Sequence, residues 1–426
     1  MIASLIIILA ITLFAAFPMF LVLGLPPLAN VLVYFKDVDP IIIVQKWISG
    51  VSPFPLIAVP LFIFAAEIML KGELSARLTN FAHKLVGHIH GGLAHTLCLS
   101  CMIFGALSGS VQATLAAIGG VMYPSLKKEG YKDTFILGLT VAAAEVALLI
   151  PPSISAIVYG VLTGTSIGAL FLGGILPGVL MGLIYMAYSY WWAKKHGVPR
   201  LPRATFKEIA VATRQATWPL GLPVVIIGGI YTGILTPTEA AAAGIAYAFF
   251  IEKFVYRSIT LKDLFAVALK TGTTTALVFI ILAASEALSW VLTYGRVPQL
   301  ATEAAMALKP SPIMLLMIIN LIFFIALMFF DGLAAKVVLV PIIFPIAKAY
   351  GIDPVHLGVL VTINCTIGTI TPPYGCDLFT AAALFNQPYA KVVKGVPVFI
   401  VLGVIVLLIC TYIPGFSTWI PNMAFK

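Results

Sequence analysis

The chain has 426 residues, of which 61% are hydrophobic and only 10% charged, and its mean hydropathy is +1.09. This composition excludes a soluble globular protein. It predicts an all-α polytopic membrane protein, because the apolar runs reach the length of a spanning helix and do not alternate as barrel strands do. The formal net charge of +9 comes mainly from loop lysines and arginines, so it reports orientation in the membrane rather than binding of nucleic acid.

The chain begins with an apolar run, Ile2–Leu25, that carries no basic segment and no evident cleavage site. This run is predicted to be a retained first membrane helix rather than a cleaved signal peptide. Two segments that mix charged and apolar residues, Leu28–Val51 and Ser258–Leu269, are predicted to be amphipathic connectors at the membrane surface. The other predicted spanning helices are Pro53–Leu70, Thr134–Leu162, Ile167–Trp192, Trp218–Leu235, Pro237–Phe254, Thr273–Tyr294, Val355–Leu384 and Val392–Ile413.

Two further apolar stretches, Gly92–Tyr123 and Pro312–Ile346, are too long for one spanning helix and too interrupted for two. Each is predicted to form a re-entrant helical hairpin, which enters and leaves the membrane on the same side. The hairpin tips are expected at the small and polar interruptions, Ser108-Gly109-Ser110 in the first stretch and Asp331-Gly332 in the second.

The hairpins belong to two halves that repeat each other, with each matched residue 221 positions later in the second half, as 124 and 345 are. Both copies end in a proline pair, Pro151-Pro152 and Pro372-Pro373, which deletes backbone donors and breaks a helix. Paired interruptions in corresponding halves point to a transporter's binding site. The alternative is that the prolines only kink their helices and the glycines only allow close packing. The other matched residues are Pro124, Lys127, Gly130 and Leu139 in the first half and Pro345, Lys348, Gly351 and Leu360 in the second.

The loop after Ile167–Trp192 is rich in basic residues and has Glu208 as its one acid. The positive-inside rule makes this loop cytoplasmic, and counting the spans outward from it places the N-terminus inside and the C-terminus outside. The two hairpins then open from opposite sides of the membrane, as in an inverted repeat. The basic residues of the loop are Lys194, Lys195, Arg200, Arg203, Lys207 and Arg214.

The tips and breaks offer hydroxyl groups, and backbone carbonyls and amides that have no partner within a helix. The carbonyls and hydroxyls suit a hard cation such as Na⁺, and the amides suit a carboxylate. Sodium is therefore predicted to bind where each tip faces its break, and a substrate carboxylate to bind between the tips. The predicted sodium-binding residues are Ser108, Gly109, Ser110, Pro151, Ser153, Ser155, Asp331, Gly332, Thr369 and Thr371. The predicted substrate-binding residues are Ser108, Asp331, Arg296 and Glu145.

Charged residues inside a membrane are costly and therefore point to function. Asp331 lies at a predicted hairpin tip, and Glu145 lies shortly before the first proline pair. Glu145 either faces the same cavity or serves as a protonated or paired packing acid. Arg296 either holds the substrate carboxylate through its two parallel donors or anchors its helix at the membrane surface. Glu67 and Glu286 are predicted to have structural roles.

The chain contains no nucleotide-binding loop, catalytic triad or redox motif. It is therefore not predicted to be an enzyme, and Na⁺ as the coupling ion is the only inorganic group expected, with no cofactor. Two alternatives to this interpretation stay open: a stand-alone sodium, carboxylate or ion transporter on the same inverted-repeat plan, and a membrane scaffold that transports nothing.

Five stretches carry a family resemblance: Gly91-Gly92-Leu93-Ala94, Gly105–Gly119 (GALSGSVQATLAAIG), Ile150–Ser153, Gly351–His356 and Thr371–Gly375. With them the chain resembles, over nearly its whole length, the large membrane subunit of tripartite ATP-independent periplasmic (TRAP) transporters. The resemblance implies an elevator-type, Na⁺-coupled transporter of the bacterial inner membrane that takes an organic acid from a periplasmic binding protein. It also implies a heterodimer with a small four-helix membrane subunit, and substrates that are chiefly C4-dicarboxylates or sialic acids. The family's ion sites correspond here to Ser108, Gly109, Ser110, Pro151, Ser153, Asp331, Gly332 and Thr371.

Three residues depart from the family pattern, and they concern the substrate rather than the class. Glu145 stands in place of a small hydroxyl residue, Asp377 in place of Asn, and His90 in place of a basic residue. Gln112-Ala113-Thr114 in the first hairpin and Phe329-Phe330-Asp331 in the second are similar to the sialic acid branch.

The sequence thus predicts four segments, in which a transport domain made from both hairpins and their broken helices slides against a scaffold. The segments are 1–86 (scaffold helices and an interfacial arm), 87–193 (first transport repeat, with its helix broken at 150–153), 194–308 (basic cytoplasmic loop and scaffold helices) and 309–426 (second transport repeat, with its helix broken at 371–373).

Overall fold

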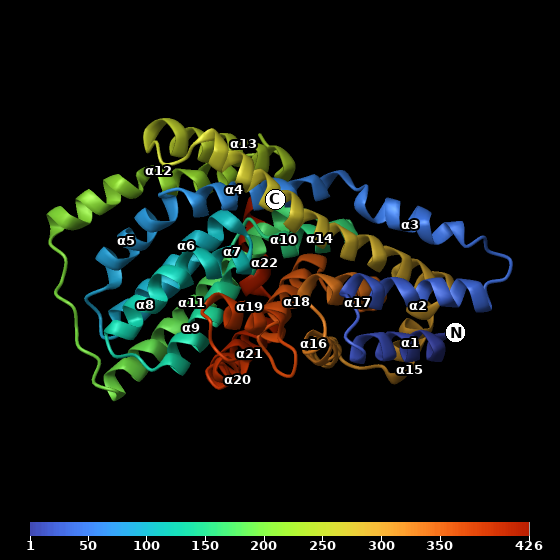
Figure 1. The fold of residues 1–426 in the computed structure, drawn as a ribbon. Coiled ribbons are helices and arrows are strands. Elements are labelled where there is room, and N and C mark those ends of the chain that lie inside the picture. The colour runs from blue at the N-terminus through green and yellow to red at the C-terminus, as the bar shows by residue number, and fades with distance from the viewer. Residues whose placement is uncertain (426) are drawn as a thin grey trace.

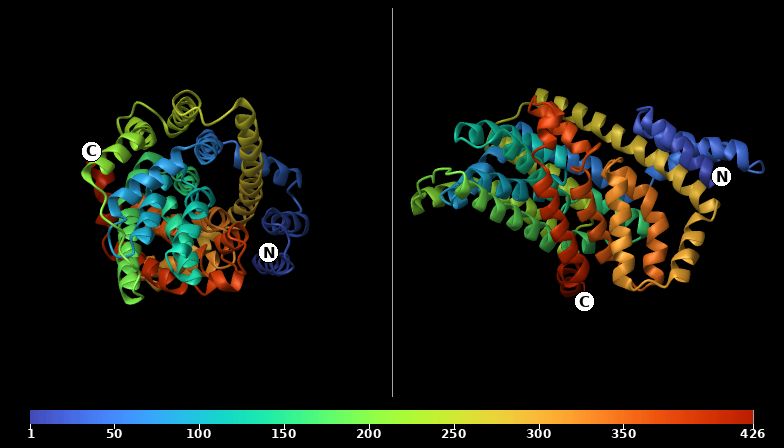
Figure 2. Two further views of the ribbon diagram at one scale, coloured as in Figure 1. Left: turned by 60° about the vertical axis from the view of Figure 1, so that its left-hand side comes forward. Right: turned by 90° about the horizontal axis from the view of Figure 1, so that it is seen from below.

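The computed structural model describes residues 1–425, and every regular element in this range is a helix. Figure 1 shows an elongated bundle in which the N-terminal helices lie at one end and helices of the first repeat extend toward the other. Figure 2 shows that the long helix α14 (Leu261–Tyr294) runs along one side of the bundle and reaches the N-terminal helices.

The first repeat consists of a helical hairpin, a broken helix and one long helix. The hairpin is made of α6 (Gly92–Ser108) and α7 (Val111–Thr114), which continues through the π-helical turn Leu115–Gly119 into α8 (Gly120–Lys128). The broken helix and the long helix are made of α9 (Asp133–Glu145), the 3₁₀ turn Val146–Leu148, α10 (Ile154–Thr163) and α11 (Ile167–Lys195).

The second repeat has the same order of elements. Its hairpin and broken helix are α16 (Pro312–Leu327), α17 (Gly332–Ala349), α18 (Pro354–Gly368) and α19 (Cys376–Leu384). The helices that follow are α20 (Tyr389–Val393), α21 (Pro397–Tyr412) and α22 (Gly415–Ala424), and the last two meet at an angle of 57°.

Both proline pairs break their helices where the sequence predicts it. The helix that begins as α9 stops before Pro151-Pro152, and the helix that begins as α18 stops before Pro372-Pro373; each pair contains a cis peptide bond. The proline rings remove backbone donors at these positions, so the carbonyls and amides at both breaks are released from helical hydrogen bonding.

The prediction of one continuous first helix over Ile2–Leu25 is wrong. The segment forms two short helices that pack against each other, α1 (Ile2–Phe14) and α2 (Met19–Tyr34). The chain reverses between them because Ala16 adopts a left-handed φ of +57° and Pro18 cannot continue a helix from the residues before it.

The prediction that Ser258–Leu269 is a separate surface connector is also wrong. Helix α14 already begins at Leu261, where Thr260 and Asp263 form a reciprocal capping box, and it runs without a break to Tyr294. The remaining elements are α3 (Ile41–Val51), the 3₁₀ turn Phe54–Ile57, α4 (Ala58–Lys71), α5 (Leu74–Val86), α12 (Phe206–Tyr231), α13 (Pro237–Phe250), the π-helical turn Ile251–Val255 and α15 (Val297–Leu308).

Several helices have the length and apolarity of membrane spans, so the chain is a multi-pass membrane protein. Within residues 1–425, four helices meet both criteria alone, and the bent pair of α21 and α22 can form a fifth span. The four are Phe54–Lys71, Ile167–Lys195, Leu261–Tyr294 and Gly332–Ala349. The arms of the broken helices are shorter, which is the length expected of elements that end inside the protein rather than at its surface.

The basic loop between α11 and α12 is tied to the helix α5. Thr205 and Glu208 form a capping box at the start of α12, and Lys84 of α5 lies 3.0 Å from the Glu208 carboxylate. The hydrogen bond from the Thr205 amide, assisted by Lys84, lowers the pKa of Glu208 to about 2. The carboxylate is therefore charged at every physiological pH.

Candidate functional site

The tip of the first hairpin lies directly on the break of the first broken helix. Gly109 at the tip has a left-handed φ of +58°, and a methyl group added there would collide with the carbonyl oxygen of Pro152. Glycine alone allows this conformation and this close approach together. Beyond the break, the Ser153 hydroxyl accepts a hydrogen bond from the Ala156 amide at 3.2 Å and so caps α10.

The tip of the second hairpin lies on the break of the second broken helix in a corresponding way. The amide of Tyr374, just after the proline pair, donates to the carbonyl of Met328 at 3.2 Å. The thiol of Cys365 lies 3.7 Å from the carbonyl of Gly332. The structure therefore places each tip against the break that the sequence paired with it.

Ser110 and Asp331 occupy equivalent positions, 221 residues apart, and each starts the second arm of its hairpin. The Ser110 hydroxyl accepts a hydrogen bond from the Ala113 amide at 3.4 Å. The Asp331 Oδ1 accepts two, from the amides of Leu333 at 2.9 Å and Ala334 at 3.1 Å. The second hairpin thus holds a carboxylate at the positive end of a helix dipole, where the first hairpin has only a hydroxyl.

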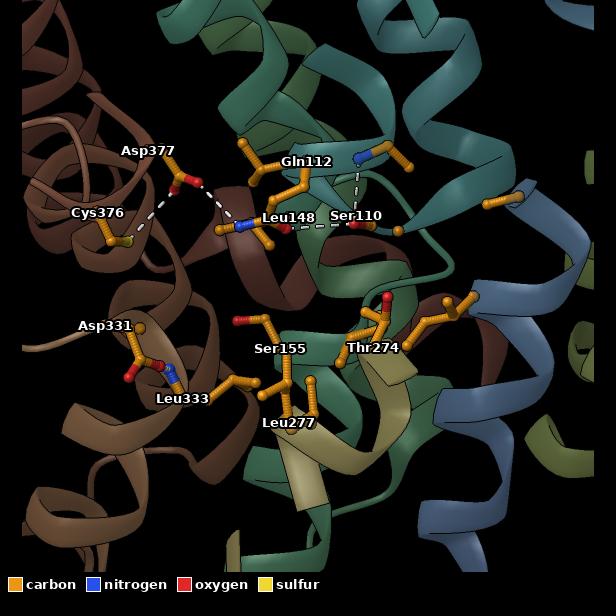
Figure 3. A pocket seen from close by; sticks show the side chains of 18 of the residues that line it. Ser110, Gln112, Leu148, Ser155, Thr274, Leu277, Asp331, Leu333, Cys376 and Asp377 are labelled. Atoms are coloured by element: carbon orange, nitrogen blue, oxygen red, sulfur yellow. Dashed lines mark hydrogen bonds between the residues drawn. The ribbon is translucent and has the colours of Figure 1, made fainter. Parts of the chain in front are cut away.

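Each hairpin also contacts the broken helix of the other repeat. Gln112 of the first hairpin donates through Nε2 to Oδ1 of Asp377 at the start of α19, over 2.9 Å (Figure 3). From the second hairpin to the broken helix of the first repeat, the ammonium of Lys336 on α17 donates to the carbonyl of Ser155 on α10 at 3.2 Å, and also to the Ser155 hydroxyl. The third acceptor is the hydroxyl of Thr362 on α18, at 3.4 Å. These two ties join the halves of the protein.

Lys336 is a site residue that the sequence interpretation missed. It is fully buried, and within residues 1–425 no carboxylate lies within 4.0 Å of its ammonium. Its partners are one carbonyl and two hydroxyls, the oxygen types that bind Na⁺ at the ends of broken helices. The sequence did contain a signal for Lys336, because a lysine within the apolar run of α17 is an intramembrane charge, and such charges point to function.

The tips and breaks open onto a cavity of about 470 Å³. Figure 3 shows Asp331 and Asp377 on one side of this cavity, with Thr274 of α14 on the side facing them. The side of the cavity that faces the two aspartates is formed by α4 and α14, where the Glu67 carboxylate and the Lys270 ammonium pair at 2.8 Å. Lys270 is the only basic side chain among the described residues that line the cavity, and its charge is matched by that of Glu67.

The threonines of the second break present free lone pairs. The hydroxyl of Thr369 donates its proton to the carbonyl of Cys365 at 2.8 Å, and that of Thr371 donates to Ile367 at 2.7 Å. Because the protons are engaged in the helix, the oxygens remain able to accept a hydrogen bond or to bind a cation.

The predicted site residues fall into three groups in the structure. The first group lines the cavity, and consists of Gly109, Ser110, Ser155, Asp331, Gly332 and Thr369. The second group belongs to the tips and breaks but does not line the cavity, and consists of Ser108, Pro151, Ser153, Thr371 and Glu145. The third is Arg296 alone, which is exposed at the start of α15 and outside the cavity, where a surface anchor would lie. Gln112 and Asp377 line the cavity and were not among the predicted site residues.

The arrangement combines hydroxyl, carbonyl and carboxylate oxygens with the N-termini of interrupted helices around one cavity. Such a set can bind small cations at the oxygens and a carboxylate at the helix N-termini.

A family model described as "Tripartite ATP-independent periplasmic transporter, DctM component" matches residues 6–416. The chain is 45% identical, over all of both chains, to the ectoine/5-hydroxyectoine TRAP transporter large permease protein of Ruegeria pomeroyi. It is 44% identical to the ectoine TRAP transporter large permease protein of Halomonas elongata, over 90% of each chain. It is 36% identical to the sialic acid TRAP transporter large permease protein of Vibrio cholerae, over 89% of each chain.

Among solved structures, the fold is similar to that of the Alcanivorax borkumensis YdaH transporter, described as having an unusual topology. The TM-score is 0.60 at 14% sequence identity, and the match covers 89% of this chain and 86% of the other. At this identity the likeness concerns the fold.

Proposed function

The chain belongs to the large permease subunits of TRAP transporters, which are permeases for organic acids and not enzymes, and we propose that its uptake is driven by Na⁺. The sodium ions bind where the hairpin tips meet the broken helices, at the residues predicted above. The transport domain, made from both repeats, moves as an elevator against a scaffold that includes α4 and α14. The N-terminus faces the cytoplasm and the C-terminus the periplasm.

The contact of each hairpin tip with its own helix break is the observation that carries this proposal. At both places loose carbonyls and hydroxyls with free lone pairs converge, as at Thr369 and Thr371, while the ends of helices provide amides. If the tips and breaks served only helix packing, this would explain the glycines at close backbone contacts. It would not explain why Asp331 caps a helix inside an apolar bundle.

The substrate proposed here is a small zwitterionic carboxylate, such as ectoine, rather than a sialic acid or a C4-dicarboxylate. Asp331 and Asp377 line the cavity, and the charge of its one lysine is matched by Glu67. A dianion would therefore meet a negatively charged wall, whereas a zwitterion carries its own positive group toward those carboxylates. The higher identity to the ectoine permeases than to the sialic acid permease supports the same choice.

Large permeases of this family work with a small membrane subunit and a periplasmic substrate-binding protein. We expect this chain to form a heterodimer with such a subunit and to receive its substrate from such a protein, rather than to work alone.

Uptake of radiolabelled ectoine by proteoliposomes containing both membrane subunits tests this function. With the binding protein present outside, we expect accumulation that needs external Na⁺ and that stops when Na⁺ is replaced by K⁺ or when the binding protein is left out. Excess unlabelled ectoine should compete, and succinate or sialic acid should not. Accumulation at the full rate without Na⁺ would refute the coupling, and competition by succinate or sialic acid alone would refute the substrate class.

A further inference from the structure

Glu145, the last residue of α9, is a buried acid that lacks a partner. None of its surface is exposed, and neither of its carboxylate oxygens makes a hydrogen bond within the described part of the chain. A carboxylate cannot be left bare in an apolar interior without a large desolvation cost. The charge of Glu145 must therefore be offset by a bound proton or by a bound cation.

The groups that surround Glu145 come from the second repeat. Its carboxyl group faces Asp377 of α19 and Thr369 at the second break. Asp377 is 2% exposed; its Oδ1 accepts from Gln112, and its Oδ2 has only the thiol of Cys376 at 3.7 Å. The Thr369 oxygen has free lone pairs, because its proton is donated to Cys365. Carboxylate and hydroxyl oxygens from both repeats thus converge on one point.

No basic side chain neutralises this group of oxygens. Within residues 1–425, neither Glu145 nor Asp377 forms a salt bridge. The buried ammonium of Lys336 donates to Ser155 and Thr362, and that of the cavity's lysine, Lys270, pairs with Glu67.

We propose that Glu145 and Asp377 bind a monovalent inorganic cation of the Na⁺ class, at a third site that shares Thr369 with the second tip-and-break site. Hard cations take carboxylate and hydroxyl oxygens as ligands, and one positive charge lowers the negative charge of the two carboxylates from two to one. Thr369 and Asp377 line the cavity and Glu145 does not, so the ion enters from the cavity and comes to rest behind its wall.

The site has no counterpart elsewhere in the internal repeat. By the offset of 221 residues, Glu145 corresponds to Thr366 and Asp377 corresponds to Ala156. The symmetry-related place therefore contains no carboxylate, and one additional cation is expected rather than two. As a coupled ion this cation rests on the proposed function, but its binding can be measured without transport.

The test is equilibrium binding of ²²Na⁺ to the purified complex of both membrane subunits, comparing the parent with Glu145→Gln. Glutamine keeps the size of the side chain and removes the charge. We expect the variant to bind about one Na⁺ fewer per complex at saturation, because one ligand set has lost its charge. Asp377→Asn, a smaller change closer to the surface of the cavity, should give the same loss, and it provides the result if Glu145→Gln does not fold.

Glu303→Gln serves as the matched control, because Glu303 is an exposed acid on α15 outside the cavity, and it should leave the number of bound ions unchanged. If both site variants bind as many ions as the parent, the proposal is overturned, and a proton or plain packing accounts for Glu145. If the parent binds no Na⁺ at all, the proposed sodium coupling fails as well, so the two failures are distinguishable.

Discussion

At the scale of single residues, the site is organised by charges placed at the ends of helices. Asp331 sits at the N-terminus of α17 and accepts two backbone hydrogen bonds, so its charge is stabilised by the helix dipole even inside the bundle. Lys336 lies on the same helix, bonded only to neutral oxygens. Its ammonium is thus a positive charge fixed to the chain and surrounded by carbonyl and hydroxyl oxygens, the oxygen types that we propose as sodium ligands at the tips and breaks.

Replacing Asp331 by Asn separates its charge from its role as a cap. Asparagine caps a helix about as well as aspartate, so Asp331→Asn should keep assembly and thermal stability close to those of the parent. We expect uptake to fall by about tenfold or more, the equivalent of losing one charge-assisted interaction. Normal uptake by Asp331→Asn would show that Asp331 is only a cap.

Replacing Lys336 by Met separates stability from transport in a similar way. The change removes the desolvation cost of a buried charge, but it leaves the Ser155 and Thr362 oxygens without the hydrogen bonds that Lys336 donates, so the two effects oppose each other and the midpoint of thermal unfolding should change little. Uptake should fall by about tenfold or more, because the charged tie between α17 and α10 is lost. Lys348→Met, at an exposed position near the end of the same helix, is the control. An unchanged rate for Lys336→Met would mean that the ammonium has no part in transport.

At the scale of elements, the hairpin tips and the broken helices form units that depend on close backbone contact. The first tip can approach Pro152 only because Gly109 has no side chain. The second tip is joined to its break by the backbone hydrogen bond from Tyr374 to Met328. The tips are therefore held by shape and backbone geometry, which leaves the remaining oxygens and amides free for the ions and the substrate that we propose.

Replacing Gly109 by Ala should lift the first tip from its break. The added methyl group meets the Pro152 carbonyl and also makes the left-handed φ unfavourable, at a cost of about 1–2 kcal/mol for the backbone alone. We expect weaker Na⁺ dependence and strongly reduced uptake in the proteoliposome assay. Gly120→Ala in the same hairpin is the control, because a methyl group there meets nothing within 4 Å and alanine favours the helix. Equal uptake by the two variants would contradict the assigned role of the tip.

Most of this architecture is visible in the sequence, because it rests on local signals. Proline pairs, glycine at a tip and polar interruptions of apolar runs act on the backbone where they stand, so both hairpins and both breaks could be placed. The turn at Ala16 could not be predicted, because no neighbouring residue requires an alanine there to adopt a left-handed φ. The ties from Gln112 to Asp377 and from Lys336 to Ser155 also escaped prediction, since they link residues 265 and 181 positions apart and depend on how the two halves pack.

At the scale of the whole molecule, the two repeats form one body whose halves are joined across the cavity. Each hairpin binds its own break through backbone contacts and the opposite half through a side chain, Gln112 or Lys336. Helices α4 and α14 close the cavity from outside with the Glu67–Lys270 pair. These ties favour joint movement of the two repeats, as the proposed elevator mechanism requires.

The central claim is that Na⁺ moves with the substrate, and simultaneous flux of both measures this most directly. Proteoliposomes with both membrane subunits receive ²²Na⁺, labelled ectoine and the binding protein on the outside. We expect ectoine together with its binding protein to trigger entry of ²²Na⁺, and an inside-negative potential to speed this entry, since each net positive charge gains about 2.3 kcal/mol per 100 mV. Ectoine accumulation with no accompanying entry of ²²Na⁺ would refute sodium coupling.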